Sequence, residues 1–147
     1  MAPLGFRRKG STFFVRHDDV LLMVNLQKST SSTSAKVIAT LNLGVFSYPL
    51  AQALEELEYL ESRISIWLCH WQERIGAVMP EHYDKWWAVS SLEEAVQAGK
   101  EMVEALQNYG LPALEKVDST AKLHALWESV VNHQVRPILY ELNIFPH

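Results

Sequence analysis

The chain has 147 residues, of which 48% are hydrophobic and 20% charged, with a formal net charge of −4. This balance is typical of one globular domain over residues 1–147 and excludes a disordered chain, and the acidic charge argues against nucleic acid as a partner. Because no apolar run approaches about 18 residues and no secretory signal is recognisable, we expect a cytoplasmic protein that does not enter a membrane.

Strands are predicted in the first third of the chain. Residues 12–16 and 20–27 show a two-residue period that divides their side chains between two faces, and the turn residues 17–19 separate the two segments. A Ser/Thr-rich loop follows, and residues 35–46 then alternate again. Three consecutive strands with short or flexible links predict an antiparallel meander.

The middle of the chain mixes helical and extended patterns. Apolar residues from Leu50 to Leu60 recur at helical spacing after Pro49, which suits a first helical turn. Residues 63–71 alternate in a way that favours a strand. A loop around Pro80 leads to a short strand at 86–89.

Two further helices are predicted near the end. Ser91 and Glu94 suit a capping box for a helix over 92–108, which Gly110 and Pro112 would end. Its apolar stripe comprises Leu92, Ala95, Val96, Gly99, Met102, Val103 and Leu106.

The last helix begins near Asp118 or Ser119 and is broken at Pro137. We expect it to bury Leu123, Leu126, Trp127 and Val130. The order of elements predicts an α+β fold: an antiparallel meander sheet of about three to five strands, with two or three helices packed on one face.

Short motifs in a fixed order carry a family resemblance. They are LGFRRKGSTFF, VNLQKS, LNLGVF, RIGAVMP, the cluster Asp84-Lys85-Trp86-Trp87, and LQNYGLPALEKV, and they extend from Leu4 to Val117. Together they resemble bacterial domain-of-unknown-function family 4304. Members usually carry a helix before the first glycine-phenylalanine pair, where this chain has only MAPL. The resemblance implies an α+β domain, and it brings no established activity, substrate or catalytic residue.

Two amides form the first candidate site. Asn25 and Gln27 point to one face of their strand, and Thr40 and Asn42 point to one face of the next. If these strands pair, the amides cluster and offer hydrogen bonds to a peptide or a polar ligand. Alternatively, they satisfy one another or water on a partly open sheet face.

A second candidate lies in a segment rich in tryptophan, arginine and histidine. Arg74, Asp84, Trp86 and Trp87 belong to it, and tryptophan and arginine often dominate the binding energy of interfaces. Arg74 could pair with Asp84 and fix the loop, or meet a carboxylate of a partner. The alternative is that the tryptophans complete the core while the charges remain solvated.

Other reactive residues favour structural explanations. Arg7, Arg8 and Lys9 could hold an anion, but a solvated turn is the simpler interpretation. His70, His82 and Asp84 do not follow a known metal-ligand spacing, so we expect no metal. Cys69 and His70 are neighbours on a predicted strand and would point to opposite faces, which predicts a buried, inert thiol.

The chain shows no nucleophile elbow and no dinucleotide fingerprint. We therefore expect a non-enzymatic module without a cofactor that binds another protein, with Asn25, Gln27, Arg74, Asp84, Trp86 and Trp87 as binding residues. An immunity-like role, in which the acidic protein masks a basic toxin, is a specific version. The alternative is a small enzyme or small-ligand binder with a site between the sheet and the Trp-rich loop. A further hypothesis is a homodimer that forms through an open sheet face.

Overall fold

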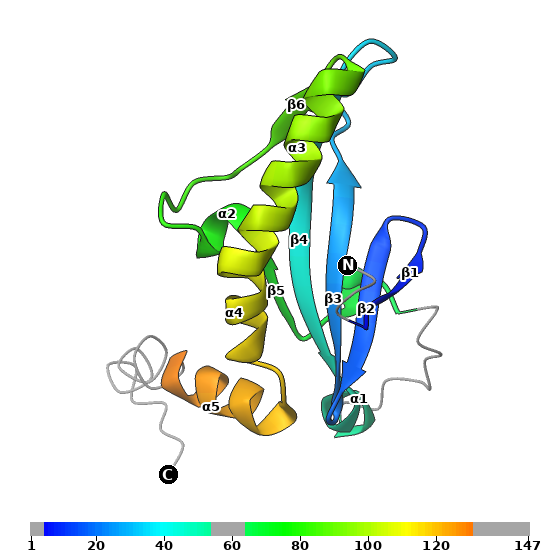
Figure 1. Cartoon of the computed structure of the whole chain (residues 1–147). Coiled ribbons are helices and arrows are strands. Elements are labelled where there is room, and N and C mark those ends of the chain that lie inside the picture. The colour runs from blue at the N-terminus through cyan, green and yellow to red at the C-terminus, as the bar shows by residue number, and fades with distance from the viewer. Residues whose placement is uncertain (1–4, 54–63, 131–147) are drawn as a thin grey trace, which may run out of the picture.

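The computed structural model describes residues 5–53 and 64–130. In this part of the chain an antiparallel sheet is covered on one face by a long helical run (Figure 1). The α+β fold with a meander sheet is therefore confirmed. None of the described helices is both long and apolar enough to cross a membrane.

The sheet has six strands, one more than the upper limit expected from the sequence. The first four follow one another as a meander, and β5 and β6 both pair with the free edge of β4, at different stretches of that strand. The strands are β1 (Arg7–Lys9), β2 (Thr12–His17), β3 (Val20–Lys28), β4 (Val37–Ser47), β5 (Trp71–Arg74) and β6 (Trp87–Val89).

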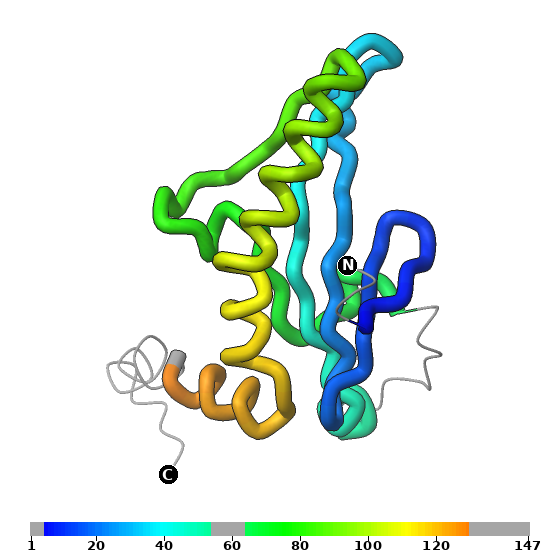
Figure 2. The backbone as a smooth tube through the Cα atoms, viewed as in Figure 1, coloured from blue at the N-terminus to red at the C-terminus, as the bar shows by residue number. Residues whose placement is uncertain are grey.

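Helices connect and cover the strands. The longest, α3, continues through a π-helical turn (η4) into α4, and this run crosses one face of the sheet (Figure 2). The helical elements are α1 (Tyr48–Ala53), η3 (Ile66–Leu68), α2 (Ile75–Val78), α3 (Leu92–Ala105), η4 (Leu106–Gly110), α4 (Leu111–Glu115) and α5 (Thr120–Val130).

Each sheet face carries its own core. Because side chains alternate along a strand, Val24, Leu43 and their neighbours face the helical run, where they pack with Ala98 and Leu106. The opposite set forms a second cluster, in which Leu21, Met23 and Phe46 meet Ile64, Ile66 and Cys69. The second face is therefore closed at one end, and it carries polar side chains at the other.

Three details differ from the sequence-based expectation. The segment 63–71 was expected to be a strand, but it contains the 3₁₀ turn η3, and the strand β5 begins only at Trp71. Gly110 and Pro112 do not end the helical run: Gly110 has an ordinary helical φ of −67°, and Pro112 stands at the start of α4, where the missing amide is tolerated. Arg7–Lys9 form the edge strand β1 rather than a turn.

The burial of two helices also differs. Leu123 of α5 is fully buried, as expected, but Leu126 and Trp127 are 38% and 36% exposed. Much of the apolar stripe of α3 likewise faces away from the core. The expected helix beyond residue 53, the residues before Gly5, the side chain of Val130 and the break at Pro137 lie outside the described residues.

Candidate functional site

The register of β3 and β4 brings the predicted amides together. Asn25 lies opposite Asn42, and Gln27 lies opposite Thr40. The Asn42 side-chain nitrogen Nδ2 donates to Oε1 of Gln27 at 2.8 Å and to Oδ1 of Asn25 at 3.3 Å. Asn42 is buried, whereas Asn25 and Gln27 are half-buried. The three amides therefore form a connected polar floor on the second sheet face.

The network continues to both sides of this floor. Toward β2, the Asn25 amide donates to the Thr12 hydroxyl at 2.9 Å. Toward β5, the register places Arg74 opposite Asn42, and Arg74 Nε donates to the side-chain amide oxygen Oδ1 of Asn42 at 3.4 Å. Four strands thus contribute one polar side chain each to a row that runs across the sheet.

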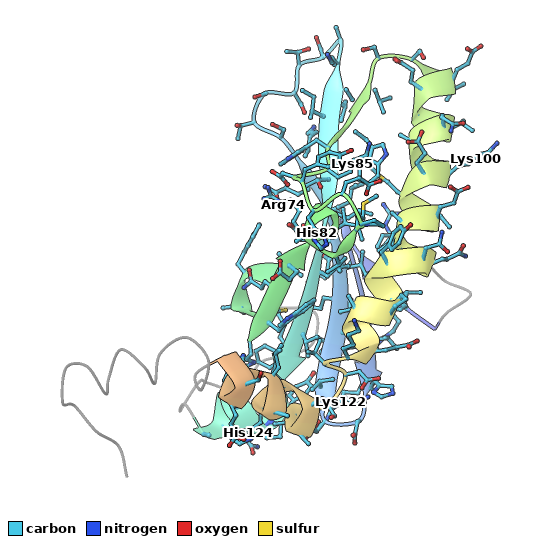
Figure 3. The ribbon with its side chains drawn as sticks, turned by 90° about the vertical axis from the view of Figure 1, so that its left-hand side faces the viewer. Arg74, His82, Lys85, Lys100, Lys122 and His124 are labelled. Atoms are coloured by element: carbon cyan, nitrogen blue, oxygen red, sulfur yellow. The ribbon has the colours of Figure 1, made fainter. Side chains whose placement is uncertain are left out.

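Arg74 connects the hydrogen-bond network of the sheet to the Trp-rich loop. Its Nη1 atom is 2.9 Å from Asp84 Oδ2, and the Trp86 indole N–H donates to the same oxygen at 2.8 Å. The guanidinium carbon lies 5.0 Å from the Trp86 ring centroid, which suits a cation–π contact. Figure 3 labels Arg74 and Lys85, which lie on the side of the molecule that carries the Trp-rich loop.

A buried threonine ties the loop to the sheet. The Thr40 hydroxyl, which has no solvent exposure, donates to the main-chain carbonyl of Lys85. Because this bond links the middle of β4 to the residue between Asp84 and Trp86, it fixes both of those side chains over the sheet edge. The loop is therefore positioned by the sheet rather than by its own secondary structure.

Trp67 is a site residue that the sequence reasoning missed. It lies on η3 with 59% of its surface exposed, and it borders a shallow hollow of about 220 Å³ together with Asn42 and Arg74. The sequence pattern could have indicated this exposure, because Trp67 lies at an odd-numbered position whereas the buried Ile64 and Ile66 lie at even-numbered positions. We call the set Thr12, Asn25, Gln27, Asn42, Trp67, Arg74, Asp84 and Trp86 the amide–arginine surface.

Trp87 does not join this surface. It pairs with Ala39 in the β4–β6 register and is buried in the core on the opposite sheet face. Lys85 Nζ lies 5.3 Å from its ring centroid. The Trp87 indole N–H is buried and finds no acceptor among the described residues. Of the six residues proposed from the sequence, the structure brings together five.

The histidines and the cysteine have other surroundings. His70 Nδ1 accepts a hydrogen bond from the main-chain amide of Ser47 at 2.9 Å, and His82 Nδ1 lies 3.1 Å from the Ala77 carbonyl oxygen. Among residues 5–53 and 64–130, no group of three or more His, Cys, Asp and Glu side chains is placed to hold a metal. Burial raises the pKa of the Cys69 thiol to about 12, so the thiolate is scarce at neutral pH.

The two arginines of β1 lie over the aromatic rings of β2. The guanidinium carbons of Arg7 and Arg8 are 5.0 Å and 5.9 Å from the ring centroids of Phe14 and Phe13. Arg8 Nε also donates to the Gly10 carbonyl at 2.8 Å. These cations cover the side chains of their own hairpin.

Two larger hollows involve residues of the helical side. One, of about 450 Å³, includes Val15 and Leu114 in its lining. The other, of about 510 Å³, includes Trp71, His82 and Tyr109. Neither is lined by a residue of the amide–arginine surface, so these hollows are separate from it.

The chemistry available at the amide–arginine surface is recognition through hydrogen bonds and stacking. Within the described part of the chain, Gln27 Nε2 makes no hydrogen bond to protein and remains available as a donor. Arg74 uses Nε and Nη1 internally, and its other guanidinium nitrogen still carries donors. Carbonyl or carboxylate oxygens are the acceptors that such donors select.

Comparison with known proteins identifies a family. A family model described as "Domain of unknown function (DUF4304)" matches residues 1–116. No curated protein and no solved structure matches the chain.

Proposed function

The chain belongs to the family described as a domain of unknown function (DUF4304), and we propose that it is a non-enzymatic module that binds another protein through the amide–arginine surface. The observation that carries this proposal is Trp67, a large aromatic side chain that is 59% exposed beside Arg74. Exposed tryptophan next to arginine is the composition that dominates binding energy at protein interfaces.

The shape of the surface supports a protein partner over a small ligand. Pockets for small molecules usually enclose about 300–1,000 Å³. The hollow beside Arg74 encloses about 220 Å³, and neither Gln27 nor Asp84 lines it. The floor is instead a sheet face with several donors and acceptors, which suits a partner segment that supplies main-chain carbonyls or carboxylates.

Pre-organisation also supports binding. Arg74 is held by Asn42, Asp84 and Trp86, so little side-chain freedom remains to be lost when a partner docks. Asp84 keeps the guanidinium in place while other nitrogen donors stay available. A surface of this kind needs no rearrangement before association.

The immunity-like role is a more specific version of this proposal. Its support is the net charge of −4, which suits a basic partner surface and would accelerate association with it. At the site itself Glu73 and Asp84 stand beside Arg74 and Lys85, so the local surface carries both signs. The charge of the whole domain, rather than that of the site, favours this version.

The experiment starts from a partner cross-linked at the surface. A photoreactive amino acid at position 67 captures the neighbour in cells that produce the protein, and the recovered protein is purified and titrated by calorimetry. We expect Trp67→Ala and Arg74→Ala each to weaken binding by about tenfold or more. Trp127→Ala, at a half-exposed tryptophan on α5, is the matched control and should leave affinity unchanged.

Two results would contradict the proposal. One is a cross-linked protein that binds the wild type, Trp67→Ala and Arg74→Ala equally well. The other is a small metabolite that co-purifies with the chain and is lost on Arg74→Ala, which would support the ligand-binding alternative.

A further inference from the structure

Helix α3 carries an apolar stripe that the rest of the described chain, residues 5–53 and 64–130, does not cover. Ala98 and Ala105 face the core and are almost fully buried. In contrast, Leu92, Val96 and Val103 are 81%, 53% and 45% exposed. With Gly99, these residues recur at spacings of four, three and four, which is the pattern of a seam between two packed helices.

Gly99 lies in the middle of this stripe, and the contacts among the described residues of one copy give no reason for it. A Cβ atom added at Gly99 would meet nothing within 4 Å. A helix with glycine in its interior is less stable than one with alanine there, so Gly99 costs helix stability without relieving any crowding in the part of the chain that the structure describes. At contacts between helices, however, small residues allow the two backbones to approach closely.

We propose that α3 forms the interface of a homodimer, in which two copies of the helix pack antiparallel about a two-fold axis. The axis passes between residues 97 and 98. This register sets Leu92 of one copy beside Val103 of the other. It also seats Val96 of one copy against the notch at Gly99 of the other.

Charge complementarity selects a second copy as the occupant. Glu93 and Lys100 are exposed and flank the stripe on the same side, seven residues apart. Two helical turns, about 10 Å, separate them along one helix, so they do not pair within the chain. In the antiparallel register, Glu93 of each copy lies beside Lys100 of the other, which gives two identical ion pairs.

The position of Lys100 agrees with this arrangement. Figure 3 shows Lys100 projecting from α3 away from the sheet. Closed two-fold dimers require a patch that complements itself, and a stripe with both charge signs on its flank meets that requirement. A parallel pairing would not bring Glu93 and Lys100 of the two copies together.

The test is the oligomeric state of the full chain, measured by sedimentation velocity over a wide concentration range. We expect a reversible dimer. Glu93→Lys or Lys100→Glu alone places like charges together, and each should weaken the dimer by about tenfold or more. The double variant E93K/K100E restores both pairs and should restore the dimer. Lys36→Glu, the same charge change on the exposed loop before β4, is the matched control and should have no effect.

Each other outcome overturns the proposal. A chain that is monomeric at every concentration excludes the dimer. A dimer that the single reversals do not weaken, or that the double variant does not restore, excludes this register. If the chain is monomeric, alkylation of Val96→Cys identifies the reason: a protected thiol indicates cover by another segment of the same chain, such as residues 131–147, and a reactive thiol indicates an open face. Native Cys69 is buried and does not interfere.

Discussion

Gly44 should be intolerant of even one added carbon. It lies at the centre of β4, on the face that η3 covers, and a Cβ atom there would be 2.5 Å from Ile66 Cδ1 and 2.7 Å from Cys69 Sγ. Both neighbours are buried, so neither has solvent into which to move. We therefore expect Gly44→Ala to lower the free energy of unfolding by about 1–3 kcal/mol, the usual cost of overpacking.

The matched control is Gly99→Ala, the same change of atoms at a position where the added Cβ meets nothing. Removing a glycine from a helix interior should raise the free energy of unfolding by about 0.5–1 kcal/mol. The two substitutions are therefore expected to have opposite signs. Measuring at low protein concentration keeps any association through α3 from contributing.

Urea unfolding followed by tryptophan fluorescence measures both variants. With an m-value of about 2 kcal/mol per M, a loss of about 2 kcal/mol lowers the midpoint by about 1 M. An unchanged or raised midpoint for Gly44→Ala would refute the reasoning, because it would show that η3 can move away from the sheet without cost.

Two further predictions concern titratable groups. Asp19 accepts a hydrogen bond from the Thr120 amide at the start of α5, and this bond holds the pKa of the Asp19 carboxyl below its usual 3.8. The stabilisation that the ionised Asp19 carboxylate provides is complete above pH 3.8 and is lost as the pH falls through the lower folded-state pKa. Asp19→Ala should therefore lower the free energy of unfolding by about 0.5–2 kcal/mol at pH 7 and by less in acid. An equal loss at both pH values in calorimetry would contradict this. Burial raises the pKa of Cys69 to about 12. The reaction of this thiol with a disulfide reagent at pH 8 should therefore be negligible in the native protein and rapid in denaturant. Rapid labelling without denaturant would contradict this.

The strands were predictable because alternation follows directly from the geometry of an extended chain. Over residues 20–27 and 35–46, the two sets of alternating positions indicated two faces, and the structure places Val24 and Leu43 on one face and Asn25 and Asn42 on the other. Short links then restricted the pairing to neighbours. The clustering of the amides followed from these two steps, with no knowledge of tertiary contacts.

The segment around η3 was not predictable in the same way. Ile64 and Ile66 are buried and Ser65 and Trp67 exposed, which imitates the alternation of a strand. Alternating burial reports which side of a segment is covered, whereas strand identity depends on hydrogen bonds to a neighbour. Ile66 and Cys69 pack close to Gly44, more than 20 residues earlier in the chain, and the sequence does not specify that contact.

The error at α3 has a different cause. The sequence correctly indicated the helix and its N-terminal cap, in which the Ser91 hydroxyl accepts a hydrogen bond from the Glu94 main-chain amide at 3.1 Å. The stripe of large apolar residues does not, however, mark the face of the helix that packs on the sheet. Close packing of α3 on the sheet selects small residues, so Ala98 and Ala105 are buried while Leu92 and Val96 are exposed. Hydrophobicity scales give alanine too little weight to predict this orientation.

The two proposed surfaces lie on opposite faces of the sheet, and this placement has a functional consequence. α3 packs on the face of Val24 and Leu43, whereas Asn25 and Asn42 belong to the other face. Pairing through α3 would therefore leave both amide–arginine surfaces of a dimer accessible. A dimer with two open sites binds a repetitive or dimeric partner with avidity, because the second contact is intramolecular. The charge reversals at Glu93 and Lys100 separate the two effects: they should remove the avidity for a dimeric partner and leave the affinity for a monomeric one unchanged.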